Sequence, residues 1–151
     1  IAEEGRIIAG VVYLPMRNAL YAAAEGQGAT LNGAPITVLD DKPINTATLL
    51  TTKPTVDPAH WTAGVPQFKR TFRSSLAFRL ALVAEGRFDG MLTFRPTWEW
   101  DVAAGSLIVT EASGHATTKD GQAPRFNNQH PQINGMVAAG GIHPQIMTAL
   151  K

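Results

Sequence analysis

Apolar residues in the first third of the chain follow patterns typical of strands. Residues 7–13 are mostly apolar and β-branched, and the apolar residues 20–24, which follow a run of turn formers, indicate an antiparallel return. Asn32-Gly33 favours a two-residue hairpin turn, because both central positions of that turn need a positive φ. Residues 46–52 make a further candidate strand. We therefore expect a meandering sheet in the first forty residues, with the strand at 46–52 after it.

The pattern changes at residue 74, where good helix formers begin. Residues 74–86 ("SSLAFRLALVAEG") predict a helix that starts with capping serines and stops at a glycine. Residues 88–94 read as a strand and residues 101–113 as an apolar helix stopped by Gly114. A strand and turn at 115–122, a buried strand at 135–140 and a helix opened by Pro144 complete the pattern.

Interleaved strands and helices place the chain in the mixed α/β or α+β class. Its 151 residues suit one domain, and neither a repeat nor an interior linker divides them. The 13 basic and 12 acidic residues nearly balance without any basic cluster, so we expect no polynucleotide partner. No apolar run is long enough for a membrane span. The absence of cysteine excludes disulfides, thiolate zinc sites and cysteine nucleophiles, and it fits a cytoplasmic location.

Asp101 is the first candidate for a functional side chain, and spacing alone leaves two interpretations open. As the first residue of a helix it would bind the free backbone N–H groups there. Followed by the small residues 103–105, it would also suit one ligand position of a magnesium site, although not a whole site. Glu99 lies two residues earlier, so in an extended segment its side chain would point the same way, either to share a cation or simply to be solvated.

Ser74 and Ser75 form the second candidate group, because they precede a predicted helix. Their structural role would be capping, and the alternative is that the helix N-terminus binds a phosphate group. Arg79 follows one turn later, either beside the same anion or at the surface.

Other candidates are better explained by structure. We expect Trp98 and Trp100 to pack in the core. We expect His143 to cap the last helix, and none of the four histidines has metal-ligand spacing. The sequence contains no nucleophile elbow, P-loop or dinucleotide fingerprint.

One longer motif carries a family resemblance. Residues 100–114, "WDVAAGSLIVTEASG", resemble the signature W-D-x-A-A-G, apolar helix, E-A-G-G of the inositol monophosphatase superfamily, with Ser113 as the single departure in that tail. Three further segments agree in the same order: "GVVYLP" at 10–15, "AEGQGATLNGAPI" at 24–36 and "SSLAFRLALVAEG" at 74–86. The resemblance covers nearly the whole chain, and within the superfamily it is closest to the bacterial 3′(2′),5′-bisphosphate nucleotidases.

The resemblance implies a fold, an activity and site residues. The fold would be the C-terminal portion of a layered αβαβα sandwich, and the activity would be magnesium-dependent hydrolysis of a small phosphomonoester. Asp101 would be a magnesium ligand, while Ser74, Ser75 and Arg79 would lie in the substrate-contacting segment. Phe94 stands where inositol-specific relatives have a glutamate, which favours a bisphosphate nucleotide over inositol phosphate.

The superfamily's remaining metal ligands come from an upstream glutamate pair and an Asp-x-[Ile/Leu]-Asp-Gly-[Ser/Thr] motif, and the 151 residues contain neither. We therefore expect the chain to be the C-terminal half of a longer phosphatase and to be inactive without its N-terminal half. The intact protein would bind two or three Mg²⁺ ions and, by the same resemblance, form a homodimer. The alternatives are an inositol monophosphatase of broad specificity and a non-catalytic domain that binds an anion or a partner.

Overall fold

Two sheets organise the chain, and the computed structural model describes them over residues 1–151. The antiparallel sheet has the order β3-β4-β5-β6, with bounds Ala9–Leu14, Ala19–Ala24, Ala29–Leu31 and Ala34–Pro35. The mixed sheet has the order β11-β13-β9-β7-β8, with bounds His115–Thr117, Met136–Ala139, Gly90–Thr93, Thr48–Leu50 and Lys69–Thr71. Two short pairs lie outside them, β1 (Ala2–Glu3) with β2 (Arg6–Ile7) and β10 (Thr97–Trp98) with β12 (Gln132–Ile133).

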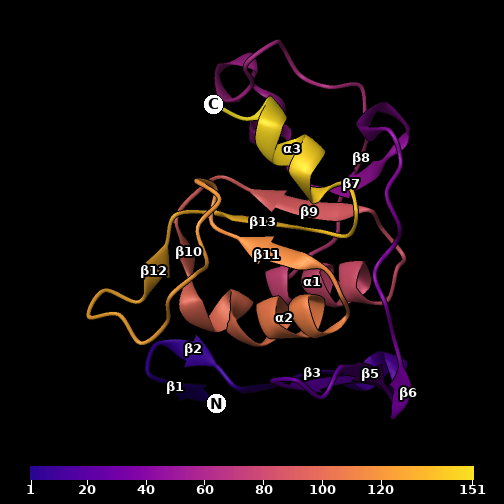
Figure 1. The fold of residues 1–151 in the computed structure, drawn as a ribbon, viewed down its shortest axis with the longest axis vertical. Coiled ribbons are helices and arrows are strands. Elements are labelled where there is room, and N and C mark those ends of the chain that lie inside the picture. The colour runs from indigo at the N-terminus through magenta and orange to yellow at the C-terminus, as the bar shows by residue number, and fades with distance from the viewer.

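Helices α1 (Leu76–Ala84) and α2 (Glu99–Glu111) lie between the two sheets, and α3 (His143–Ala149) covers the far side of the mixed sheet (Figure 1). The layers therefore run sheet, helices, sheet, helix, as expected for part of an α/β sandwich. Four 3₁₀ turns connect the elements: Pro15–Arg17, Ile44–Thr46, Lys53–Val56 and Pro58–His60. None of the helices combines the length and the apolar character needed to cross a membrane.

The mixed sheet is buried on both faces because its side chains alternate between two hydrophobic clusters. Leu50 and Met91 point into the cluster around α1 and α2, whereas Leu49 and Leu92 point into the cluster around α3 and Trp61. A strand buried on both faces has a continuous apolar sequence, and this explains why "GMLT" and "MVAA" show no polar alternation.

The predicted hairpin and helices are present with small shifts at their ends. Asn32 and Gly33 have φ values of 51° and 80°, and they join β5 to β6 as the turn chemistry requires. Gly86, with φ of 69°, follows α1. Helix α2 begins at Glu99, two residues before the predicted start, and this difference changes the role of both acidic residues in its first turn.

Close contacts on two sides hold α2 in place. A Cβ atom at Gly105 would lie 2.6 Å from Cβ of Leu80 on α1, and a Cβ atom at Gly10 on β3 would lie 2.9 Å from Cα of Ala104. These distances are shorter than side chains tolerate, so the glycines are what allow the backbones to approach. The small residues of the "DVAAG" segment therefore act as packing surfaces.

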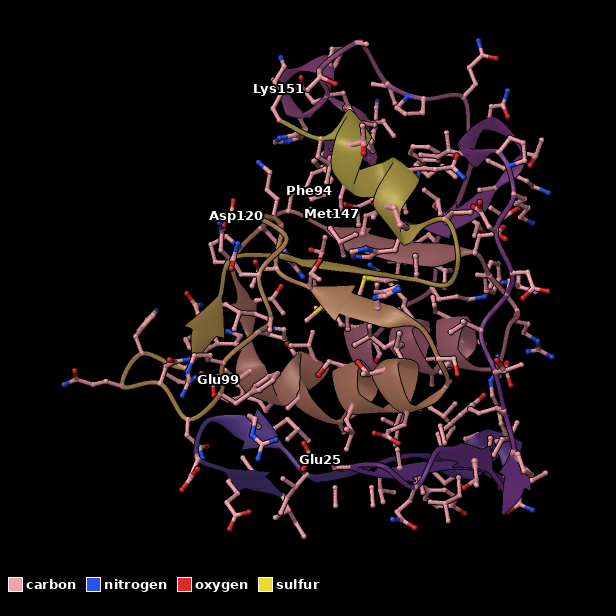
Figure 2. The ribbon with its side chains drawn as sticks, in the orientation of Figure 1. Glu25, Phe94, Glu99, Asp120, Met147 and Lys151 are labelled. Atoms are coloured by element: carbon pink, nitrogen blue, oxygen red, sulfur yellow. The ribbon has the colours of Figure 1, made fainter.

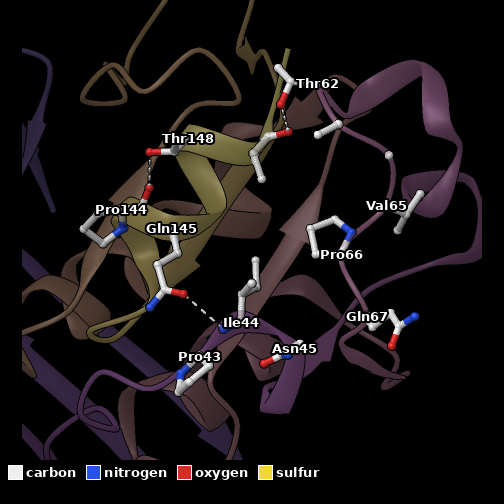
Figure 3. Close-up of a pocket in the computed structure, with 13 residues that line it drawn as sticks. Pro43, Ile44, Asn45, Thr62, Val65, Pro66, Gln67, Pro144, Gln145 and Thr148 are labelled. Carbon is white, nitrogen blue, oxygen red and sulfur yellow. Dashed lines mark hydrogen bonds between the residues drawn. The ribbon is translucent and has the colours of Figure 1, made fainter.

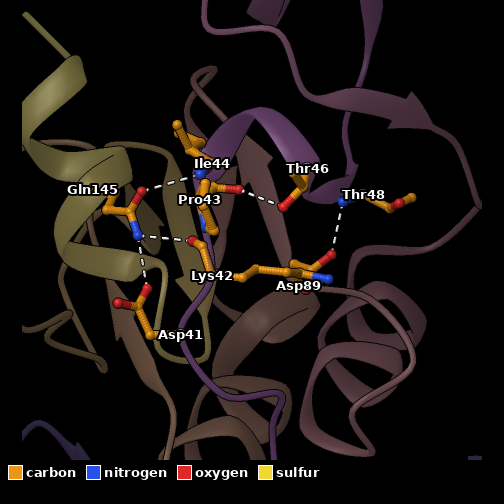
Figure 4. Close-up of polar contacts among 8 residues, drawn as sticks. All are labelled: Asp41, Lys42, Pro43, Ile44, Thr46, Thr48, Asp89 and Gln145. Carbon is orange, nitrogen blue, oxygen red and sulfur yellow. Dashed lines mark hydrogen bonds and ion pairs between the residues drawn. The ribbon is translucent and has the colours of Figure 1, made fainter.

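Carboxylates hold the end of α2 and the connection between the two sheets in place. Glu111, the last residue of α2, accepts hydrogen bonds from the backbone N–H groups of Gly26 and Gly28 at 2.9 and 2.8 Å, which ties the helix to the β4–β5 turn. The connection from the antiparallel to the mixed sheet is held in a similar way (Figure 4). There the buried Asp89 accepts from the N–H of Thr48 at 2.7 Å and pairs with Lys42 at 2.6 Å.

Helix α3 begins differently from the expectation. Ile142 is the N-cap, no side chain caps the helix, and His143 is its first residue. The imidazole is buried, with Nε2 3.0 Å from Oγ1 of Thr117 and the ring centroid 5.1 Å from that of His115. The prediction that His143 caps the helix was wrong, because its ring turns inward against β11.

We expect Gly105→Ala to lower the free energy of unfolding by about 1–2 kcal/mol, because overpacking against Leu80 outweighs the gain in helix propensity of about 1 kcal/mol. Urea titration monitored by circular dichroism measures this difference. Gly10→Ala tests the contact with Ala104 on the other side of α2 in the same assay. Stability equal to or above that of the wild type in both variants would show that the packing is not tight.

A second prediction concerns pH. Burial, with His115 nearby, lowers the pKa of His143 from 6.5 to about 4. Between pH 6.5 and about 4, His143 therefore stays neutral in the folded chain but binds a proton in the unfolded chain. The contribution of the neutral imidazole to the free energy of unfolding is complete above pH 6.5 and is lost as the pH falls toward 4. The full change is at most about 3 kcal/mol. His143→Gln should flatten the dependence of the unfolding free energy on pH in this window, whereas the same change at the exposed His130 should not.

Candidate functional site

Asp101 is the third residue of α2, and its carboxylate has no partner within the chain. The side chain is exposed, and no ion pair or hydrogen bond within the chain involves it. The N-cap is Trp98, so Asp101 does not cap the helix as its position in the sequence allowed. Its negative charge is stabilised by the helix macrodipole alone, and both oxygens remain available to a cation or to solvent.

Glu99 has the opposite character, although it lies only two residues earlier. Its carboxylate is buried and accepts hydrogen bonds from the N–H of Asn127 at 2.7 Å, the N–H of Asn128 at 3.1 Å and Nδ2 of Asn128 at 2.6 Å. Figure 2 shows Glu99 beside the loop that leads to β12. The segment is helical and not extended, so the expectations of a shared direction with Asp101 and of a solvated side chain were both wrong.

The two tryptophans that flank Glu99 are exposed and not in the core. Trp98 and Trp100 keep 39% and 65% of their surface in solvent, and their rings stack on each other at 4.8 Å with 8° between the planes. The expectation that both pack in the core was wrong. They form an aromatic pair next to Asp101 at the start of α2.

The start of α1 shows backbone strain as well as capping. Ser75 is the N-cap, and its hydroxyl accepts a hydrogen bond from the N–H of Phe78 at 3.3 Å, as expected of a capping serine. Its φ of 63° lies in the left-handed region, which non-glycine residues rarely occupy. Such strain persists where surrounding structure enforces it, and it is often found at functional sites. Ser74 precedes it and is exposed.

Arg79 is buried, with 5% of its surface exposed, and is therefore not the surface residue that one interpretation of the sequence allowed. Its Nε donates to the carbonyl of Arg73 at 2.5 Å, and its guanidinium lies over the ring of Phe72 at 4.6 Å. None of the chain's ion pairs involves Arg79. Burial, together with the nearby charge of Arg95, lowers the pKa of Arg79 from its usual value. A buried cation without a carboxylate is costly unless an anion joins it.

The residues at the start of α1 line one cleft of about 740 Å³. It brings together Ser74, Ser75 and Arg79, which is the arrangement that one of the two interpretations of the sequence allowed. It does not include Asp101, which follows the cleft residue Arg95 by six positions across β10. The other lining residues are Thr52, Pro54, Thr55, His60, Phe72, Thr93, Phe94 and Arg95. Sequence reasoning missed Phe72, which lies just before the motif, and His60, which only the fold brings to the start of α1.

A second, larger groove of about 920 Å³ lies between α3 and the segments 43–45 and 62–67 (Figure 3). Prolines, small residues and uncharged amides line it, and none of its residues is charged. In Figure 3 the amide of Gln145 is already bonded to the N–H of Ile44, at 3.0 Å. This groove therefore lacks charged groups for binding a phosphorylated ligand.

The residues present fit a magnesium site only in part. Mg²⁺ prefers carboxylate oxygens and commonly takes one or two of them, with water or phosphate oxygens filling the remaining positions. The unpartnered carboxylate of Asp101 suits this role. The structure holds no cluster of three or more His, Asp or Glu side chains that could bind a metal ion. Asp101 alone therefore offers one ligand position and not a complete protein site.

The sequence model of the inositol monophosphatase family matches residues 1–151. The chain belongs to the inositol monophosphatase family. Among relatives in the family, the protein named Nus factor SuhB from Escherichia coli (strain K12) is 33% identical over an alignment of 159 positions, which covers 97% of this chain and 55% of that protein. The inositol-1-monophosphatase of Rhizobium meliloti (strain 1021) is 34% identical over an alignment of 153 positions, which covers 95% of this chain and 54% of that protein.

A solved structure supports the assignment of the fold. The inositol monophosphatase from Anabaena (Nostoc) sp. PCC 7120 superposes with a TM-score of 0.71 at 30% identity, and the match covers 93% of this chain and 57% of that chain. The fold expected from the resemblance to the inositol monophosphatase superfamily is thus confirmed. The chain spans about half the length of the curated relatives that it matches.

The contrast between the two acidic residues of α2 predicts different effects of the same chemical change. Glu99→Gln removes a charged acceptor from three hydrogen bonds and should lower the free energy of unfolding by about 1–3 kcal/mol. Asp101→Asn should change it by less than about 1 kcal/mol, because its carboxylate has no partner. Thermal unfolding of both variants measures this. A loss at Asp101 as large as that at Glu99 would assign Asp101 a structural role.

Proposed function

We propose that this chain supplies one metal ligand and the substrate cleft of a magnesium-dependent phosphatase that hydrolyses a small phosphomonoester, with a 3′(2′),5′-bisphosphate nucleotide as the substrate. The observation that carries the proposal is the unpartnered carboxylate of Asp101, in the family motif and close in sequence to a cleft lined by arginines. In a family named for phosphatases, this combination supports metal-assisted phosphate hydrolysis.

The roles of the residues follow from their surroundings. Asp101 contributes an oxygen ligand, and bound Mg²⁺ would stabilise charge on the phosphate and make water a better nucleophile. Ser74, at the start of α1, and the nearby backbone N–H groups offer donors to an anion. Arg79 offers a guanidinium whose charge no carboxylate of the chain neutralises. The remaining metal ligands would come from a further segment of the intact protein.

The choice of a nucleotide over inositol phosphate rests on the cleft itself. Phe94 occupies a lining position at which a carboxylate would favour the hydroxyl groups of inositol, and no carboxylate is found elsewhere among the lining residues. Aromatic side chains and arginines suit a base and phosphate groups better than a polyol. An inositol monophosphatase of broad specificity is the alternative within the same reaction class.

A non-catalytic role is the second candidate, and the name of one relative favours it. The Escherichia coli relative, which matches 97% of this chain, is named as a Nus factor and not as a phosphatase. A chain of this family could thus bind a partner through the same scaffold. Hydrolysis measurements separate the two roles, because a purely partner-binding protein releases no phosphate from any substrate.

The test uses the full-length protein that contains this chain. We expect magnesium-dependent phosphate release from adenosine 3′,5′-bisphosphate to exceed that from inositol 1-phosphate and fructose 1,6-bisphosphate. Asp101→Asn should lower this rate by about 100-fold or more, while Asp40→Asn, at another exposed aspartate, should not. Absence of release with every substrate would favour the non-catalytic role. Unchanged turnover of Asp101→Asn would remove Asp101 from the mechanism.

A further inference from the structure

The cleft at the start of α1 contains two cations that face the same space. Both Arg79 and Arg95 line it; Arg79 is buried, whereas Arg95, which follows β9, is exposed. The two charges are close enough for Arg95 to lower the pKa of Arg79. Neither arginine forms an ion pair, and no aspartate or glutamate lines the cleft. Two facing cations without an acid repel each other until anionic groups arrive.

The same cleft has an exposed aromatic wall. Phe72 keeps 53% of its surface in solvent, although the guanidinium of Arg79 covers its ring at 4.6 Å. His60 and Phe94 also line the cleft, and their rings meet edge to face at 5.0 Å. Phe94 is less exposed than Phe72, and Lys119 lies over its ring at 5.5 Å. Phe72 is therefore the ring with the most surface available to a planar ligand group.

From these observations we propose that Arg95 and Phe72 determine substrate specificity: Arg95, together with Arg79, binds a second anionic group of the ligand, and Phe72 stacks on its base. The inference rests on the proposed function and extends it by naming what distinguishes a bisphosphate nucleotide from a monophosphate and from inositol phosphates. Arginine binds phosphate through charged, paired hydrogen bonds. An aromatic ring stacks on any base but offers little to a polyol.

The contact between Arg79 and Phe72 also orients the exposed ring. A stacked guanidinium and phenyl ring hold each other in one orientation, so the platform is formed before the ligand binds. A ligand that places a base on Phe72 and a phosphate between the arginines would use all three side chains at once. A ligand with only one of these groups would lose the contacts of the other.

Binding of ligands to the full-length protein that contains this chain tests the proposal, measured by isothermal titration at low salt in the presence of EDTA. We expect Arg95→Gln to weaken the binding of adenosine 3′,5′-bisphosphate at least tenfold and that of adenosine 3′-monophosphate less than threefold. Arg95→Lys should recover part of the lost affinity. Phe72→Leu should weaken both nucleotides about fivefold and leave inositol 1,4-bisphosphate unchanged. Arg70→Gln and Tyr13→Leu, at exposed positions outside the cleft, are the matched controls.

Three results would overturn the proposal: no binding of the bisphosphate by the wild-type full-length protein at 1 mM, equal losses for both nucleotides in Arg95→Gln, or tighter binding of inositol 1,4-bisphosphate than of adenosine 3′,5′-bisphosphate. Circular dichroism confirms that each variant is folded. Because EDTA removes divalent cations, the experiment is independent of the metal role of Asp101. A negative binding result would therefore not contradict the metal role of Asp101. Unchanged turnover of Asp101→Asn would likewise not contradict the binding role of Arg95 and Phe72.

Discussion

The close approach of α2 to its two neighbours is the constraint on which the rest of the structure depends. Gly105 allows Leu80 of α1 to contact the helix backbone, and Gly10 of β3 does the same at Ala104. Helix α2 cannot slide or rotate against either neighbour without a clash, so its first turn has a fixed place. That turn carries Asp101, and the connection leading into it carries Arg95.

The charged side chains fall into two groups that differ in whether their hydrogen bonds are satisfied. Glu99, Glu111 and Asp89 each accept backbone N–H groups and hold a loop, a turn or a connection. Asp101 and Arg95 lack such partners, and Arg79 has only a carbonyl and an aromatic ring. Buried polar groups are normally satisfied within a protein, so the buried guanidinium of Arg79, which no carboxylate neutralises, is the exception, whereas Asp101 and Arg95 are exposed and accessible from solvent.

Local features were predictable from the sequence, and the burial of polar groups was not. The turn at Asn32-Gly33 and the cap at Ser75 depend on residues close in sequence, and both are where the pattern placed them. Glu99 finds its partners 28 and 29 positions away in a loop without regular structure. The hydrophobic periodicity of the sequence does not predict such a contact, because it depends on tertiary structure. The burial of Arg79 could not be inferred from the sequence for the same reason.

The exposed indoles of Trp98 and Trp100 give the protein a property unrelated to packing. Two chromophores held nearly parallel at 4.8 Å couple electronically, and such a pair makes near-ultraviolet spectra sensitive to its geometry. Because the pair spans the first residues of α2, any rearrangement of that turn alters the coupling. The start of α2 thus contains an optical probe next to the carboxylate of Asp101, and this probe would report a change at that carboxylate.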